Sequence, residues 1–172
     1  MANIIIISDR EKPKWQDWLS KELVKRGHLV FEPEFPKKSQ NLNEWIDALK
    51  DFRKHLGETS IMVGHGAGRA ILLKILEEKL REITGAVFLS GKSLNSEFEN
   101  FTLNDLDFKI IKEKSKNFFI YASEQDDNES MQESEQIANL LDDEVMLHDN
   151  TKYFKKDELF EDILIDILSI AD

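Results

Sequence analysis

A glycine-rich turn is the feature of this sequence whose residue types and spacing bear most directly on chemistry. A short apolar run, residues 61–63, leads into Gly64-His65-Gly66-Ala67-Gly68, and a second apolar run follows at once. This is the frame of a nucleophile elbow, G-x-S-x-G, in which a sharp strand-to-helix turn presents a serine above a parallel sheet. The middle position here is Gly66, which has no side chain. The motif therefore predicts an acyl-transfer scaffold that lacks its attacking atom.

The same glycines allow a second interpretation, as a loop that binds phosphate. The dinucleotide pattern G-x-G-x-x-G fails, because Arg69 or Ile71 falls where its third glycine is required, and the Walker pattern fails as well. A helix N-terminus still attracts anions through its free N–H groups. Arg69 near that end either adds charge to such an anion site or is an ordinary surface arginine.

The pattern of apolar residues predicts the strands and helices that position this turn. The predicted strands and helices alternate along the chain. Alternation of this kind indicates a parallel sheet with helices on both faces. We expect one α/β domain over residues 1–172, a three-layer αβα sandwich with six parallel strands in the order 2-1-3-4-5-6. The expected strands are Ile4–Ile7, His28–Phe31, Ser60–Val63, Ala86–Leu89, Asn117–Ala122 and Glu144–Leu147. The expected helices are Lys14–Lys25, Asn43–Leu56, Arg69–Lys79, Phe108–Lys114, Glu129–Leu141 and Asp157–Ala171, with Ser90–Asp107 as the longest loop.

Ligands of such sheets bind beyond the carboxyl ends of the strands. Any site should therefore draw on the residues that directly follow the six strands. These are Ser8-Asp9, Glu32-Pro33, Gly64–Gly68, Ser90-Gly91, Ser123–Asp127 and His148–Asn150.

Composition narrows the class of partner. The 172 residues carry a formal net charge of −11, which argues against nucleic acid and anionic membranes. No apolar run approaches the length of about 20 residues that spans a bilayer. Cysteine is absent, which excludes thiolate catalysis and fits a cytoplasmic protein. No metal motif occurs: a calcium loop beginning at Asp126 would need glycine and glutamate where Met131 and Ile137 stand. We expect no cofactor.

At this point the sequence resembles a known family, the small α/β-hydrolases typified by retinoblastoma-binding protein nine. The resemblance runs through most of the chain and includes the elbow. Its other pieces are Pro33-Glu34-Phe35-Pro36, Asn43-Glu44-Trp45, Val87-Phe88-Leu89-Ser90 and Phe119-Ile120-Tyr121-Ala122-Ser123 followed by Asp126. The resemblance implies a serine hydrolase with a Ser-Asp-His triad in that chain order.

Carried over by position, the implied triad is incomplete. Its nucleophile falls on Gly66, its acid on Asp126 and its histidine on Tyr153. His148, at the preceding strand end, is the candidate for a surviving base. The family tends to have glycines after the first strand, where an oxyanion donor sits, whereas this loop reads Ser8-Asp9-Arg10-Glu11-Lys12-Pro13.

Other polar residues near these positions have both a chemical and a structural interpretation. His65 is expected to pack beside the turn. Asp127 or Asn128 should cap the helix that follows. Ser8, Ser90 and Ser123 stand at strand ends, where each is a candidate displaced nucleophile, although none occupies the elbow. With Asp9, His65, Ala67 and Arg69, these serines form the expected pocket.

Two functions remain open from the sequence. The first is a non-catalytic relative that binds a small molecule, an anion or a protein in the relict pocket. The second is a weak or displaced hydrolase that uses water or a strand-end serine with His148 and Asp126. The remaining alternative is an active esterase in which the serine at position 66 has been changed to glycine by engineering.

Overall fold

Six parallel strands form the centre of the molecule in a computed structural model that describes residues 1–78, 81–149, 151–155 and 160–171. The strand order is β2-β1-β3-β4-β5-β6, and every neighbouring pair is parallel. This confirms the predicted topology. The strands are β1 (Asn3–Ile7), β2 (Leu29–Phe31), β3 (Ser60–His65), β4 (Ile83–Leu89), β5 (Ser115–Ser123) and β6 (Val145–His148).

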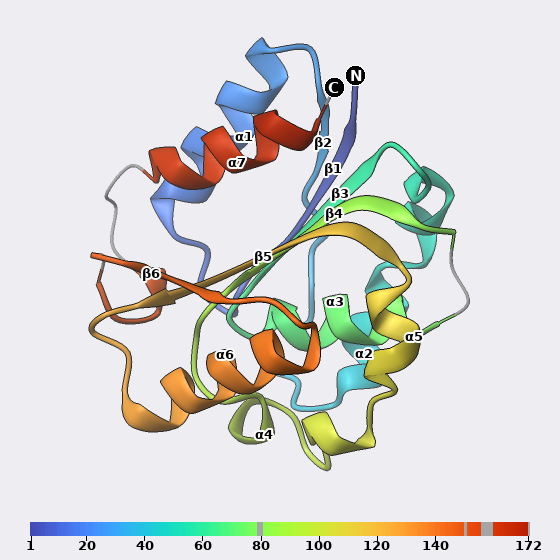
Figure 1. Ribbon diagram of the computed structural model, residues 1–172. Coiled ribbons are helices and arrows are strands. Elements are labelled where there is room, and N and C mark those ends of the chain that lie inside the picture. The colour runs from blue at the N-terminus through green and yellow to red at the C-terminus, as the bar shows by residue number, and fades with distance from the viewer. Residues whose placement is uncertain (79–80, 150, 156–159, 172) are drawn as a thin grey trace.

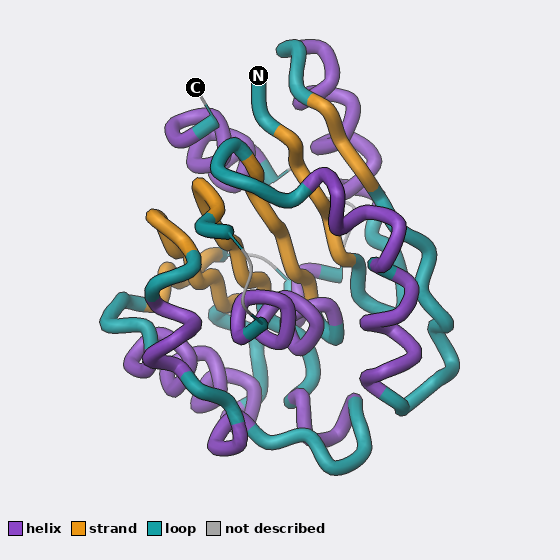
Figure 2. The backbone as a smooth tube through the Cα atoms, turned by 90° about the vertical axis from the view of Figure 1, so that its right-hand side faces the viewer, coloured by secondary structure: helices purple, strands orange, loops and turns teal. Residues whose placement is uncertain are grey.

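Helices cover both faces of this sheet (Figure 1). One face carries α1 (Lys14–Lys25) and α7 (Glu161–Ile170); the other carries α2 (Leu42–Ala48), α3 (Gly68–Glu77), α5 (Phe108–Lys112) and α6 (Asn128–Leu140). Figure 2 shows the strands fanning out, as the twist of a parallel sheet requires. Within the described residues, no helix is both long and apolar enough to cross a bilayer.

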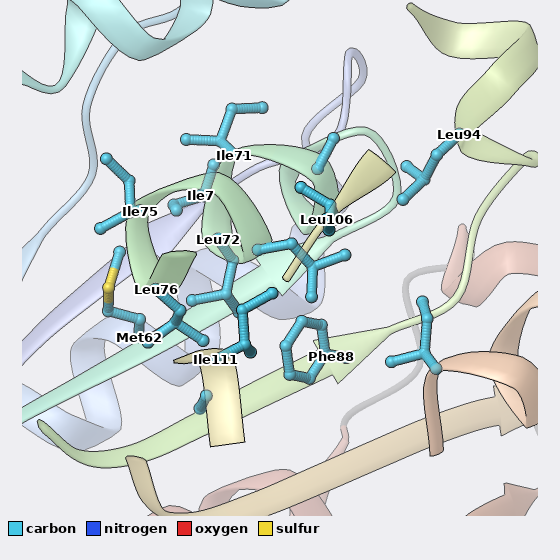
Figure 3. Close-up of a cluster of buried hydrophobic side chains, with 14 of the residues drawn as sticks. Ile7, Met62, Ile71, Leu72, Ile75, Leu76, Phe88, Leu94, Leu106 and Ile111 are labelled. Carbon is cyan, nitrogen blue, oxygen red and sulfur yellow. The ribbon is translucent and has the colours of Figure 1, made fainter. Parts of the chain in front are cut away.

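The sheet separates two apolar cores because successive side chains of a strand point to opposite faces. In β1, Ile5 and Ile7 join the core beneath α3, whereas Ile4 and Ile6 join the core beneath α1 and α7. All four isoleucines are fully buried, so the β-branched run is that of a strand covered on both sides. Figure 3 shows the larger core, with the following labelled residues: Ile7, Met62, Ile71, Leu72, Ile75, Leu76, Phe88, Leu94, Leu106 and Ile111.

Element boundaries differ from the sequence expectation in several places. The helix expected over 43–56 is instead α2 followed by a 3-10 segment, η1 (Lys50–His55). The expected loop 90–107 contains α4 (Leu94–Glu97) and the short 3-10 turn η2 (Leu103–Asp105). Its apolar side chains Leu94, Phe98, Phe101, Leu103 and Leu106 are buried in the same core as those of α3. Lys79 and residues 157–159, at the ends of two expected helices, lie outside the described residues.

Candidate functional site

The glycine-rich turn forms the predicted elbow. Strand β3 ends at His65, helix α3 begins at Gly68, and Gly66 lies between them with φ +55°. This left-handed backbone is one that residues with a Cβ rarely adopt. The Gly66 N–H donates to the carbonyl of Leu89 at 3.0 Å. A Cβ on Gly91 would lie 2.4 Å from the Gly66 Cα, so the loop after β4 packs directly against the turn.

Asp9 occupies the space that a side chain at position 66 would need. An ideal Cβ built on Gly66 would lie 2.2 Å from the Asp9 Cγ and 2.4 and 2.6 Å from its carboxyl oxygens. Real Cβ atoms essentially never approach another heavy atom so closely. Asp9 was expected in the pocket, but nothing in the local sequence placed its carboxyl group above the elbow.

Two backbone amides hold the Asp9 carboxylate in this position. Its Oδ1 accepts from the N–H of Ala67 at 3.1 Å and from the N–H of Arg10 at 2.8 Å. In an active enzyme of this fold, the amide after the nucleophile and an amide from a neighbouring strand-to-helix loop form the oxyanion hole. The N-terminus of α3 also favours negative charge. The anion expected at this helix end is therefore supplied by the chain itself.

Arg10 anchors the loop that carries this carboxylate, a role that the sequence analysis missed. Its guanidinium donates to the Glu97 carboxylate and to the Glu97 carbonyl, both at 2.5 Å. It also donates to two backbone carbonyls of the 37–39 segment at 2.7 Å each. The same group lies 5.2 Å from the ring centre of Trp45 and 5.3 Å from that of Phe98. The available sequence signal was only the position of the arginine at the end of β1.

Arg69 is buried, contrary to the expectation of a surface arginine. It is 1% exposed, and its Nε donates to the Gly66 carbonyl at 2.9 Å. A second nitrogen donates to the carbonyl of Lys92 at 2.8 Å. The third lies 3.1 Å from the carboxylate of Glu133, whose pKa is raised by burial against the opposing effect of Arg69. Arg69 therefore ties the elbow to α6, and these contacts already use its charge.

Asp126, the retained acid of the implied triad, contacts groups other than a histidine. Its Oδ2 accepts from the Ser90 hydroxyl at 2.5 Å and from the Ser123 N–H at 2.9 Å. Its Oδ1 accepts from the N–H of Tyr153 at 2.8 Å. Ser90 is 1% exposed and Ser123 is fully buried. The structure thus brings Ser90, Ser123 and Tyr153 together around Asp126. The Asp126 carboxylate connects the ends of β4 and β5 to the segment that contains Tyr153.

Tyr153, at the implied histidine position, points its hydroxyl at Asp127. The phenol donates to the Asp127 carboxylate, and the pKa of Tyr153 is raised by burial and by this carboxylate. The backbone of Tyr153 has φ +61° and is held on both sides, by Asp126 at its N–H and by His65 at its carbonyl. Asp127 also caps α6 as predicted, accepting from the Ser130 N–H at 2.8 Å.

His148 is not brought to Asp126 as a base. Its Nε2 lies 2.9 Å from the carboxylate of Asp162, next to α7, and its ring packs edge-on against Phe160 with centres 4.5 Å apart. In the described part of the chain, no hydrogen bond joins His148 to Asp126. His148 lies instead against Phe160 and against Asp162 of α7.

His65 packs beside the turn. It is fully buried, donates from Nε2 to the Tyr153 carbonyl at 2.7 Å and contacts Trp15 edge-on. Burial lowers the pKa of His65, with Asp9 acting in the opposite direction. A histidine buried in its neutral form links the β3 end to the loop before α7.

The lowered pKa predicts a specific loss of stability in acid. The unfolded chain binds a proton at His65 before the folded chain does, so this residue's contribution falls as the pH drops below about 6.5. Through His65 alone, the free energy of unfolding changes by at most about 1.4 kcal/mol per pH unit. We expect His65→Gln to remove this slope between pH 7 and pH 5 in urea denaturation, with His55→Gln, at a partly exposed histidine, as the control. A His65 ring that titrates in NMR near pH 6.5 would contradict the burial argument.

Ser8 faces a small pocket beside the elbow. Its hydroxyl donates to the Gln16 side-chain oxygen at 2.7 Å, so no base accepts its proton. The pocket has a volume of about 330 Å³ and is lined by the loop after β1, by Gln16 of α1 and by residues 32–35 and 37. Over the described ranges, no group of three or more His, Asp or Glu side chains is arranged to hold a metal ion.

Comparison with known proteins agrees with this architecture. The serine hydrolase family model matches residues 6–163. The protein YdeN of Bacillus subtilis (strain 168) is 27% identical over 164 residues, which cover 90% of this chain and 86% of YdeN. The crystal structure of the ydeN gene product superposes with a TM-score of 0.88 at 23% identity, covering 99% of this chain and 98% of that one.

A second solved structure shows the same fold at lower identity. A YdeN-like protein of Pectobacterium atrosepticum has a TM-score of 0.77 at 14% identity, over 99% of this chain and 91% of its own. The strand order, the elbow between β3 and α3 and the match over residues 6–163 agree with one another. This chain therefore belongs to the serine hydrolase family.

Proposed function

We propose that this chain is a non-hydrolytic member of its family that binds a small molecule in the pocket beside the elbow. The observation that carries the proposal is the Asp9 carboxylate. It fills the side-chain space of position 66 and accepts from the two amides that would otherwise receive an oxyanion. An acyl substrate would find no nucleophile at the turn and no free donors to stabilise its transition state.

The strand-end serines do not supply a replacement nucleophile. Ser90 and Ser123 are buried, and Ser8 donates to an amide oxygen. His148, the candidate base, pairs with Asp162. The close fit of Asp9 over Gly66 also favours a natural glycine over an engineered one, because a serine there would collide with the carboxylate.

Probes of serine hydrolases test the proposal directly. We expect the purified chain to show no labelling by a fluorophosphonate and no stoichiometric burst with p-nitrophenyl acetate, while an active serine esterase run in parallel shows both. Labelling mapped by mass spectrometry to Ser8, Ser90 or Ser123, and lost in the matching alanine variant, would refute the non-hydrolytic function in favour of a displaced hydrolase.

A further inference from the structure

Asp9 lines the pocket beside the elbow, and only one of its two carboxylate oxygens is paired within the described residues. The pocket lies at the carboxyl ends of β1 and β2, and Asp9 is one of its lining residues. Asp9 is only 8% exposed. Its Oδ1 is held by the two amides, whereas its Oδ2 accepts no hydrogen bond from the described residues. This oxygen is not fully enclosed, so water can pair with it in the free protein and a ligand's donor can replace that water.

Several donors of the pocket wall are already used within the protein. The Ser8 hydroxyl donates to Gln16, and the Gln16 amide donates in turn to Glu32 at 2.9 Å. The Lys12 ammonium lies 2.6 Å from a carboxylate oxygen of Asp17 and 3.1 Å from one of Glu32. A ligand that reaches Asp9 must therefore bring its own hydrogen-bond donor.

Charge favours a cationic donor over a neutral one. The lining contains three carboxylates, those of Asp9, Glu32 and Glu34, and two ammonium groups, those of Lys12 and Lys37. Lys12 is already paired with two carboxylates, and Lys37 is exposed at the rim. Glu32 and Glu34 are exposed as well, so the buried charge of the lining is the Asp9 carboxylate, and charge-assisted hydrogen bonds to a carboxylate are the stronger kind.

We propose that this pocket binds a small primary ammonium group, held by a charge-assisted hydrogen bond to Asp9 Oδ2. The proposal rests on the non-hydrolytic function, because Asp9 is available as a ligand-binding group only where no acyl chemistry uses the elbow. Phe35 and Pro33, which also line the pocket, provide apolar surface for a short carbon chain next to that ammonium.

An NMR titration with a cation, a neutral alcohol and an anion of similar size tests whether the pocket prefers a positive charge. We expect n-propylammonium to shift the amide resonances of Asp9, Arg10 and Gln16 saturably, with a dissociation constant on the order of 1–10 mM. Neutral n-propanol should bind about tenfold or more weakly, because it lacks the charge. Propionate should produce no saturable shift at these resonances. Equal binding of propanol, or preferential binding of propionate, would overturn the proposal.

The conservative substitution Asp9→Asn tests whether Asp9 Oδ2 binds the ammonium group. In Asp9→Asn, one amide oxygen can keep both backbone contacts while the other position becomes a donor, so n-propylammonium binding should weaken about tenfold or more. Exposed Glu11→Gln makes the same change of charge in the same loop but outside the pocket lining, and it should bind as the unaltered chain does. Unchanged binding by Asp9→Asn, with unaltered thermal unfolding, would refute the assignment to Asp9.

The two proposals fail in different ways. Absence of any n-propylammonium binding to the unaltered chain overturns the ammonium site and leaves the non-hydrolytic function unaffected. Fluorophosphonate labelling or an ester burst overturns the non-hydrolytic function, whatever the outcome of the amine titration.

Discussion

Replacing Gly66 with serine is expected to lower the free energy of unfolding by about 3 kcal/mol and to produce no esterase. The new Cβ would lie 2.2 Å from the Asp9 Cγ, and overpacking of this kind costs about 1–3 kcal/mol. The backbone at φ +55° adds about 1–3 kcal/mol of strain for a residue with a side chain. Urea denaturation followed by tryptophan fluorescence measures the loss, and p-nitrophenyl acetate measures the activity.

A double-mutant cycle tests whether Asp9 causes the steric part of the destabilisation by Gly66→Ser. In an Asp9→Ala background the carboxyl group is absent, so Gly66→Ser should cost at least about 1 kcal/mol less than in the unaltered chain. Two other glycines serve as matched controls. Gly27 has φ +87° and no neighbouring heavy atom within 4 Å of its Cβ position, so Gly27→Ser isolates the backbone strain.

Gly57 has neither a positive φ nor a heavy atom within 4 Å of its Cβ position. Gly57→Ser should therefore change the free energy of unfolding by no more than about 0.5 kcal/mol. A Gly66→Ser variant that is no less stable than Gly27→Ser, with no coupling to Asp9→Ala, would contradict the placement of the carboxyl group. An esterase burst from Gly66→Ser alone would show that the missing hydroxyl is the only defect of the elbow.

Replacing Arg69 with alanine is expected to cost about 3–5 kcal/mol, the range found when one partner of a buried ion pair is removed. The substitution leaves Glu133 buried without its counter-ion and removes the donors to the carbonyls of Gly66 and Lys92. The elbow and α6 would lose their direct link. Urea denaturation at pH 7 measures the effect.

The same variant should recover part of its stability in acid. Burial already raises the pKa of Glu133, and Arg69 opposes that rise, so removing Arg69 raises the pKa further. A carboxyl group with a raised pKa binds its proton in the folded state first, and the folded state therefore gains stability as the pH falls through that pKa. The difference between Arg69→Ala and the unaltered chain should be smaller at pH 5 than at pH 7.

A more exposed ion pair provides the comparison. Arg53 lies 2.5 Å from Glu78, and the two side chains are 33% and 40% exposed. Arg53→Ala should cost no more than about 1 kcal/mol, because solvent screens such pairs. An Arg69→Ala variant that behaves like Arg53→Ala would mean that the buried pair contributes little.

Local pattern was sufficient for most of the fold. The β-branched run Ile4–Ile7, buried on both faces, and the helical stripe of α1 predicted their elements because each depends on a period of two or 3.6 residues. The alternation of the two periods then predicted the parallel sheet and the elbow after β3. The segment 90–107 was expected to be an irregular loop, because its apolar residues stand singly among polar ones; the structure places α4 and η2 in it and buries those residues in the core that contains α3.

The sequence by itself determined the scaffold and the missing hydroxyl at Gly66, because backbone turns and apolar periods are local properties. Only the tertiary structure decided what occupies that space and how it is held. Asp9 reaches the elbow because β1 lies beside β3 in the sheet, and Arg69 meets Glu133 because α3 and α6 cover the same face. Such contacts depend on the distance between side chains on different elements, which residue spacing along the chain does not specify.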